Sequence, residues 1–464
     1  MKSHSNFFIY FFALFSLSLL AQQSARKFGR HEILEDLDYL KNSLIEAHYD
    51  LYAYTSKDEF SKNYLQIRNS MTNDSVTPLE ATTIFQKVIS KVNNGHTEIS
   101  FPAAAYREYA LSHGTLFPLE IAFEEGKALI RKNWSDKDGL KAGTEIISIN
   151  NLTIQEVLQK IYPLISAERN YLKLAKVELL SFPRLYWQAF GEQENFVVGI
   201  KEGGSIKKYK LQSINLIEDY EMKRNEIFSE KRELQLLSKY AYLKPGNFSG
   251  DEEEFKRFID SSFLDINKSN VANLIIDLRN NLGGDNSFSD YLVSYIADKP
   301  FQWSSEFTLK TSALLKAHTR KNCDTSNPYW QSVLTHQDGI IYTYEFEAHQ
   351  PQPKEKRFLG KVYVLVNRQS HSQAAVTAAQ IQDYKFGIIV GEETGDYPSL
   401  YASQFQYNLP KTGIAVKVAK GKIIRVNGSI KQEGVLPDIR IRDHLLDEED
   451  EVVLGLLKEL KGSL

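Results

Sequence analysis

The sequence contains a single cysteine, Cys323, among its 464 residues. One cysteine cannot form an internal disulfide bond, and a lone thiol in an exported chain is poorly suited to be a nucleophile that must stay reduced. An excess of either charge is absent too, because the formal net charge is only −3. With 42% hydrophobic and 25% charged residues, the composition is that of an ordinary globular protein, and it indicates no nucleic-acid partner.

Long apolar runs are missing except near the amino terminus. Lys2 and His4 precede an apolar run over 7–20 that ends at Ala21-Gln22-Gln23. This run is shorter than the ~20 residues that span a bilayer, and no cysteine follows it to carry a lipid anchor. We therefore expect a signal peptide over 1–21, export to the periplasm or the medium, and no stable membrane anchor after cleavage.

Motifs for metals and cofactors are also missing. The sequence has no paired histidine–carboxylate ligand set and no phosphate-binding glycine loop that leads into Lys-Ser or Lys-Thr. We expect neither a metal ion nor a cofactor.

The length predicts several domains, since one domain usually takes roughly 100–200 residues. Apolar residues at helical spacing, such as Leu37, Leu40 and Leu44, predict a helical domain over 27–105. Short strands over 119–123, 128–132 and 145–149, followed by a helix from about Ile154, predict a small β-unit within 106–215. A charged segment over 216–238 is typical of a solvated connector.

An α/β domain is expected over 239–446, before a C-terminal helix within 447–464. Apolar strands at 273–278, 362–366 and 387–390 alternate with helices at 287–296 and 374–382. Unbroken apolar strands that alternate with helices indicate a parallel sheet covered on both faces. The fold class is therefore multidomain α/β.

Ser372 lies where the strand 362–366 gives way to a helix. The carboxyl end of a parallel strand faces a crevice, and the next helix offers free N–H groups to a developing oxyanion. Serine is also a common helix N-cap, so its position alone leaves both roles open.

Two further segments favour a catalytic role for Ser372. Gly283 and Gly284 follow another buried strand, in Asp277-Leu278-Arg279-Asn280-Asn281-Leu282-Gly283-Gly284, where the backbone must approach something closely or adopt a positive φ. His96, in Asn93-Asn94-Gly95-His96-Thr97, is a residue type that can accept a serine proton near neutral pH. His371 adjoins Ser372, but on a regular backbone its side chain would point elsewhere.

The order of these motifs resembles the tail-specific proteases, also called C-terminal processing peptidases. Besides the segments above, the resemblance rests on Val366-Asn367-Arg368-Gln369-Ser370-His371-Ser372-Gln373-Ala374-Ala375, Gly391-Glu392-Glu393-Thr394-Gly395 and Gly434-Val435-Leu436-Pro437-Asp438. It implies a PDZ-like domain at 106–215, which could capture an extended peptide by strand addition, and a core at 239–446 like those of ClpP and crotonase. It also implies cleavage of peptides or unfolded proteins.

The same resemblance implies site residues. Ser372 would be the nucleophile, and backbone N–H groups of Gln373 and of Gly283 or Gly284 would form the oxyanion hole. One branch of the family has a lysine base where this chain has Tyr397. The branch of the tricorn core and the interphotoreceptor retinoid-binding protein has a histidine base, which corresponds to His96.

A carboxylate should orient that histidine. Relatives with a histidine base have a glutamate a few residues before Gly-Val-x-Pro-Asp, and Glu433 is the matching candidate, although the usual position, about two residues earlier, is Lys431. Lys385 and Lys411 remain alternative bases. Two other functions remain open: a non-catalytic protein that binds peptides or apolar ligands on the same scaffold, and a crotonase-like acyl hydrolase.

Overall fold

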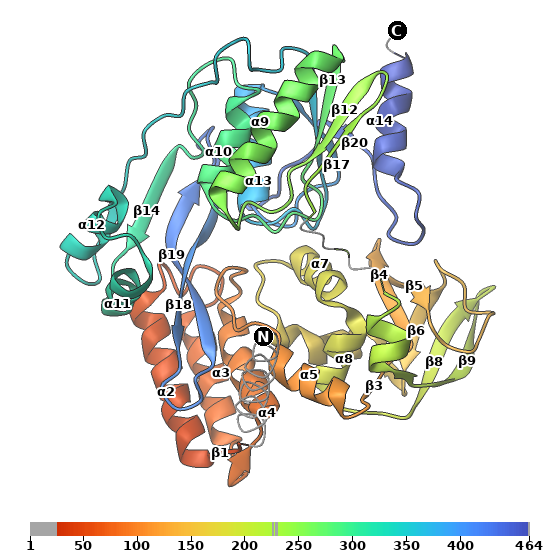
Figure 1. The fold of residues 1–464 in the computed structure, drawn as a ribbon. Helices are drawn as coiled ribbons and strands as arrows, with labels where there is room; N and C mark the ends of the chain where they lie inside the picture. The colour runs from red at the N-terminus through yellow and green to blue at the C-terminus, as the bar shows by residue number, and fades with distance from the viewer. Residues whose placement is uncertain (1–25, 225–226, 228–230, 463–464) are drawn as a thin grey trace, which may run out of the picture.

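The computed structural model describes residues 26–224, 227 and 231–462. The expected signal peptide over 1–21 lies outside the described residues. None of the helices in the described part of the chain is long and apolar enough to cross a membrane. The architecture is mixed α/β with several units, as the sequence predicts (Figure 1).

The amino-terminal unit is helical. Two of its helices begin with reciprocal caps, in which Ser56 pairs with Glu59 and Thr77 with Glu80. Its elements are β1 (Phe28–Gly29), α2 (Arg30–Ala47), α3 (Lys57–Asn69), β2 (Ser75–Val76), α4 (Pro78–Ile89) and the 3₁₀ turn η1 (Ser90–Val92).

A second unit surrounds a twisted antiparallel sheet in the order β4-β5-β6-β8-β9. The three expected strands are present, and α6 begins at Ile154 as predicted. Its elements are α5 (Ala103–Leu111), β3 (Thr115–Leu116), β4 (Leu119–Glu124), β5 (Lys127–Asn133), β6 (Glu145–Ile149), β7 (Leu152–Thr153), α6 (Ile154–Ile161), η2 (Tyr162–Leu164), α7 (Asn170–Leu180), α8 (Phe182–Phe190), β8 (Asn195–Glu202), β9 (Ser205–Gln212) and β10 (Ile214–Asn215).

The expected connector over 216–238 contains ordered elements. It begins with the π-helix η3 (Leu216–Glu221) and includes β11 (Glu233–Leu236), which pairs with the edge of the central sheet. The last part of this charged segment is therefore a strand of the core.

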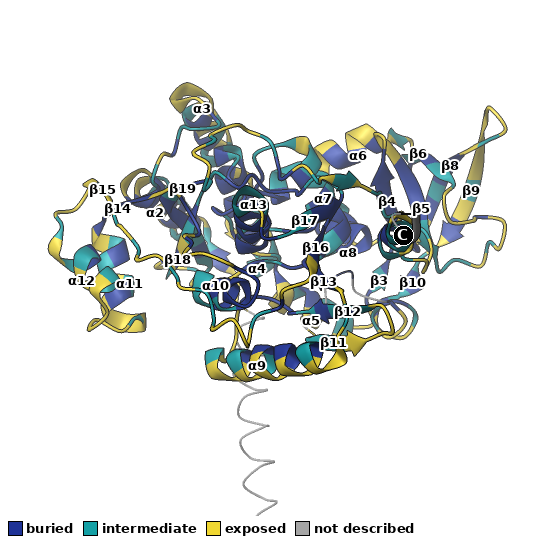
Figure 2. Cartoon of the chain, turned by 90° about the horizontal axis from the view of Figure 1, so that it is seen from above, coloured by how far each residue is buried: buried dark blue, intermediate teal, exposed yellow. Residues whose placement is uncertain are grey.

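The core is a six-stranded sheet in the order β11-β12-β13-β16-β17-β20, parallel from β12 onward. Alternate strand residues face α9, α10 and α13 on one side and α14 on the other, which explains the unbroken apolar runs. The elements are β12 (Tyr240–Lys244), α9 (Glu252–Ser269), β13 (Asn273–Asp277), α10 (Asn286–Ser294), β16 (Lys361–Val366), α13 (Gln373–Tyr384), β17 (Ile388–Gly391), β20 (Ile439–Arg440) and α14 (Glu451–Gly462). In Figure 2, α13 is buried among its neighbours whereas α9 exposes its outer face.

A four-stranded antiparallel sheet in the order β15-β14-β19-β18 joins the core to the amino-terminal helices. Its apolar face shares one hydrophobic cluster with those helices, and Figure 1 shows α2 beside β18 and β19. Its elements are β14 (Glu306–Lys310), α11 (Ala313–Asn322), α12 (Pro328–Thr335), β15 (Ile341–Thr343), β18 (Leu400–Asn408) and β19 (Ala415–Ile424).

Candidate active site

Ser372 lies in the turn between β16 and α13 with φ 53° and ψ −125°. A positive φ is uncommon for a residue other than glycine, and strained backbone of this kind gathers at functional sites. Although Ser372 occupies the N-cap position of α13, its hydroxyl makes no capping hydrogen bond. The side chain is therefore not used as a helix cap, which was the alternative that its position left open.

The glycine loop lies directly against this turn. A Cβ on Gly283 would lie 2.7 Å from the Cβ of Ser372 and 2.6 Å from the backbone nitrogen of Gln373. The N–H of Gly283 donates to Oδ1 of Asn281 at 2.7 Å. Among the described residues, the N–H groups of Gly284 and Gln373 have no such partner. Of the two glycines, Gly284 is thus the one whose N–H can still donate to an oxyanion.

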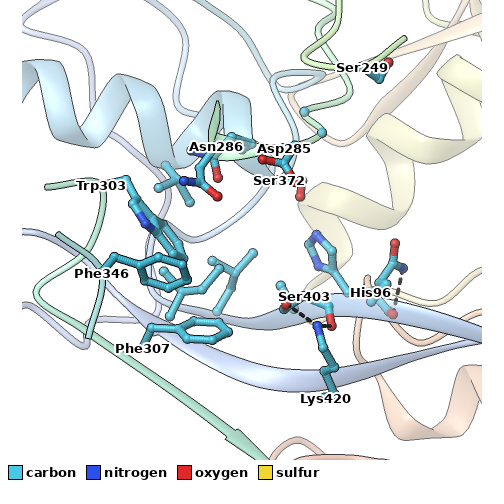
Figure 3. Close-up of a pocket in the computed structure, with 18 of the residues that line it drawn as sticks. His96, Ser249, Asp285, Asn286, Trp303, Phe307, Phe346, Ser372, Ser403 and Lys420 are labelled. Carbon is cyan, nitrogen blue, oxygen red and sulfur yellow. Dashed lines mark hydrogen bonds between the residues drawn. The ribbon is translucent and has the colours of Figure 1, made fainter. Parts of the chain in front are cut away.

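His96 reaches the serine from the loop after η1. In Figure 3 its imidazole and the hydroxyl end of Ser372 face one another across the cavity. His96 is 2% exposed, and neither ring nitrogen has a hydrogen-bond partner within the described part of the chain. Burial lowers the pKa of His96 to about 4, although the charge of Asp396 opposes this shift. The ring is therefore neutral at neutral pH and able to accept a proton.

Glu168 holds the loop that carries His96. Its Oε1 accepts hydrogen bonds from the backbone N–H of Gly95 at 2.8 Å and from Nδ2 of Asn94 at 2.9 Å. Burial, followed by the nearby charge of Asp396, raises the pKa of Glu168. On the other side of the loop, the backbone carbonyl of His96 accepts a hydrogen bond from Gln404 at 2.7 Å. These contacts join the helical unit to the second unit through Glu168 and to β18 through Gln404.

Asp396 is the carboxylate that lies among these groups. Its Oδ2 accepts a hydrogen bond from the backbone N–H of Ser372 at 2.6 Å, and it lies 2.6 Å from Nδ1 of His371 and 3.9 Å from Nε2 of His96. Burial alone would raise the pKa of Asp396, but the two histidines and the Ser372 N–H outweigh it and hold the pKa below its usual value. Asp396 is therefore ionised.

His371 corrects one expectation. On a regular backbone its side chain would point away from the site, but the backbone at Ser372 is irregular. The rings of His371 and His96 stack with centroids 4.8 Å apart and planes inclined by 7°. Nδ1 of His371 lies 2.6 Å from Oδ2 of Asp396, but the two atoms do not form an aligned hydrogen bond.

The structure does not bring every candidate to the site. The side chain of Glu433 is 41% exposed and forms an ion pair with Lys431 at 3.6 Å. Tyr397 packs under the guanidinium of Arg169, 4.9 Å from its ring centre. Lys411 pairs with Glu35 at 2.8 Å. Ser372, His96, Gly283, Gly284 and Gln373 all line one cavity. Glu433, Tyr397 and the two alternative bases, Lys385 and Lys411, do not line it.

Sequence reasoning missed Asp396, although a signal was available. Asp396 follows β17, which pairs with β16 in parallel, and the carboxyl ends of neighbouring parallel strands meet at one edge of a sheet. The loops after β13, β16 and β17 supply the glycines, Ser372 and Asp396 respectively. The position of Asp396 shortly after β17 therefore indicated a carboxylate near Ser372.

The cavity in front of Ser372 has a volume of about 770 Å³. Trp303, Phe307 and Phe346 form an aromatic wall, and Lys420 and Ser403 lie near His96 (Figure 3). One set of side chains here could also hold a metal ion: His96, His371 and Asp396 each offer a ligand atom, and these atoms lie within 4.8 Å of one another. The chemistry available without an ion is that of a serine beside a neutral histidine and an ionised carboxylate.

Comparison with known families supports the resemblance inferred from the motifs. Residues 239–441 match the model of peptidase family S41. A stretch of 97 residues is 33% identical to the tail-specific protease of Haemophilus influenzae (strain ATCC 51907 / DSM 11121 / KW20 / Rd). That stretch covers 20% of this chain and only 14% of the relative, so the match spans a small part of that protein. The resemblance to the tail-specific proteases is confirmed over this region.

Solved structures show the fold over a longer span. The crystal structure of mature CPAF is similar with a TM-score of 0.62 at 15% identity, covering 93% of this chain and 96% of that one. Mature CPAF complexed with lactacystin has a TM-score of 0.62 at 14% identity, covering 94% and 97%. The described units therefore share their overall arrangement with those of a known structure.

Proposed function

We propose that this chain, whose residues 239–441 match peptidase family S41, is a serine peptidase that cleaves peptides or unfolded proteins through an acyl-enzyme on Ser372. One observation carries the proposal: the hydroxyl of Ser372, which makes no capping hydrogen bond, faces a buried, neutral His96, and the ionised Asp396 lies 3.9 Å from Nε2 of His96. This arrangement suits a nucleophile, its general base and an orienting carboxylate.

In the first half of the reaction, Oγ of Ser372 bonds to the peptide carbonyl carbon while His96 takes the hydroxyl proton. The N–H groups of Gly284 and Gln373 donate to the resulting oxyanion. His96 then gives its proton to the leaving amine nitrogen as the C–N bond breaks. The amine leaves and the acyl group remains on Ser372.

In the second half, water adds to the acyl carbon as His96 takes a proton from it. The ester bond to Ser372 then breaks, and the proton returns to Oγ. Asp396 stabilises the imidazolium that forms twice in each cycle, and this role replaces the one expected for Glu433. His371, stacked on His96 and in contact with Asp396, would help to hold the imidazole in place.

The remaining sequence expectations extend this proposal. The unit over 106–215 would serve as a PDZ-like peptide-binding domain, and the core as a ClpP- and crotonase-like scaffold. Residues 1–21 would direct export to the periplasm or the medium. The first two of these parts follow from the resemblance to the tail-specific proteases, and the third follows from the apolar run over 7–20.

Labelling with a fluorophosphonate probe tests the nucleophile and the base. The mature wild-type protein should be labelled, whereas Ser372→Ala should not be and His96→Ala should react at least 100-fold more slowly. Ser249→Ala is the matched control, because Ser249 also lines the cavity but should keep full labelling.

A second candidate is a ligand-binding protein on the same scaffold, and the large aromatic-walled cavity is the observation that favours it. Absence of wild-type labelling, together with no cleavage of unfolded protein substrates, would decide for this alternative.

A further inference from the structure

Lys420 is a buried lysine in the wall of the cavity that contains Ser372. It lies on β19 and is 2% exposed. Figure 3 shows its amine directed toward Ser403 on the side of the cavity where His96 lies. Lys420 has no role in the proposed reaction. Burying a cation costs free energy unless the cation is paired with an anion and hydrogen-bonded.

The hydrogen bonds of Lys420 leave the amine without an anionic partner. Nζ donates to the backbone carbonyl of Ser403 at 2.9 Å and to its hydroxyl at 2.5 Å. No carboxylate forms an ion pair with it in the described part of the chain. An ammonium has three protons, so one donor remains after these two bonds.

Aromatic rings and burial complete the surroundings of the amine. Nζ lies 5.7 Å from the ring centre of Tyr329 and 5.5 Å from that of Trp330. Burial lowers the pKa of Lys420 to about 7, while the charges of Cys323 and Asp285 favour the charged form. Rings of this kind attract a cation but cannot neutralise it. An anion that enters the cavity would supply the missing partner.

The backbone is distorted where it meets this lysine. Ser403 lies opposite Lys420, between the paired residues Ala402–Gly421 and Gln404–Ala419. Its φ of 55° takes it out of the regular strand conformation, and its carbonyl accepts from Nζ. Non-glycine residues with positive φ are strained and concentrate at ligand-binding and catalytic positions. The residue that breaks the regular pairing of the hairpin, Ser403, is therefore the same residue that accepts both hydrogen bonds from Lys420.

The cavity has an aromatic wall on one side and Lys420 on another, and its lining also includes the polar residues Asp285 and Asn286. Trp303, Phe307 and Phe346 line the apolar part. The indole N–H of Trp303 is buried and has no hydrogen-bond partner among the described residues. It is a second hydrogen-bond donor that a ligand in the cavity could use. A peptide group with apolar bulk and a carboxylate matches both properties.

We propose that Lys420 is a specificity-determining residue that binds a carboxylate of the peptide substrate in the cavity beside Ser372. The carboxylate belongs either to an acidic side chain or to the end of the substrate chain. The inference rests on the proposed peptidase function for its substrate class, but the binding itself is measurable without catalysis.

Matched peptides and two lysine variants provide the test. The peptides carry either Glu or Gln at each position around the scissile bond, and end in either a free carboxylate or an amide. Lys420→Met removes the charge and keeps much of the side-chain length. Lys422→Met is the control, because Lys422 lies on the same strand but does not line the cavity.

Wild type and Lys422→Met should prefer one carboxylate over its neutral match by about 10- to 100-fold in kcat/KM, the range of a hydrogen bond between charged groups. Lys420→Met should lose this preference, measured as the ratio of kcat/KM between the two peptides of each matched pair. A preference that follows Glu identifies a side chain as the source, and one that follows the free end identifies the chain terminus.

Equal carboxylate preference in wild type and Lys420→Met, or no preference in wild type, would overturn the proposal. The affinity of the peptides for Ser372→Ala and for Ser372→Ala/Lys420→Met, measured by calorimetry, keeps the test independent of catalysis. The same loss of carboxylate preference in affinity would support the lysine site even if the peptidase function failed. A merely structural lysine would change the affinity for acidic and neutral peptides alike.

Discussion

The backbone N–H of Ser372 donates a hydrogen bond of 2.6 Å to Oδ2 of Asp396. The same oxygen faces the ring nitrogens of His371 and His96, so one buried carboxylate both fixes the strained turn of the serine and sets the charge around the imidazoles. Several expected outcomes depend on this double role.

Asp396→Asn should keep the turn, because the amide oxygen can still accept the Ser372 N–H, but it removes the negative charge. We expect fluorophosphonate labelling to slow by ~10⁴-fold, the effect of the same change in other serine–histidine–aspartate sites. Glu433→Gln should stay within about twofold of wild type, because Glu433 is half-exposed and paired with Lys431. The opposite ranking of the two variants would restore Glu433 as the orienting carboxylate.

Gly283→Ala should disable the site, because the new Cβ would lie 2.6–2.7 Å from the turn that carries Ser372. We expect at least 100-fold slower labelling. Gly413→Ala is the matched control: its φ of 72° resembles the 82° of Gly283, but nothing lies within 4 Å of its added Cβ. Gly413→Ala should lose roughly 1–2 kcal/mol of unfolding free energy, measured in urea, through backbone strain. Gly283→Ala should lose more, because its Cβ also clashes with the turn. Normal labelling of Gly283→Ala would contradict the close contact.

The pH dependence of labelling should report the pKa of His96. Only the neutral imidazole can take the serine proton, and burial lowers its pKa to about 4. The labelling rate should therefore be flat from pH 8 to about 5 and should fall as the pH drops through about 4. A midpoint near the ordinary histidine value of ~6.5 would show that His96 is not this buried base.

The stability of the protein should decline in mild acid. Burial lowers the pKa of both His48 and His96 to about 4, whereas unfolded histidines titrate near 6.5. Between these values the unfolded state binds more protons, so the free energy of unfolding falls as the pH falls from about 6.5 to 4. The loss should reach about 3 kcal/mol for each histidine.

Urea unfolding at pH 7.5 and pH 4.5 measures this loss. His48→Gln should reduce the pH dependence of the unfolding free energy by about one proton. An identical pH dependence in wild type and His48→Gln would show that His48 is not held neutral by burial.

Much of the core could be predicted from residue patterns. The apolar runs that became β13 and β16 are buried on both faces, so their hydrophobicity is continuous and easily recognised. The two long strands β18 and β19 were not predicted from the sequence, although Phe405 and Val418 alternate with more exposed residues. Its partner surface is the helical unit at the other end of the chain, and a local pattern carries no information about such a partner.

The sequence by itself determined the motif order, the strand-to-helix position of Ser372 and the nearby glycine pair, because these depend on local periodicity and on glycine's freedom at positive φ. Only the tertiary structure decided which carboxylate meets the histidines and that His371 belongs to the cluster. Asp396 and His371 meet because neighbouring parallel strands end at one edge and the backbone at Ser372 turns sharply. Lys420 could likewise be recognised only from the tertiary structure, which buries it in the cavity that contains Ser372.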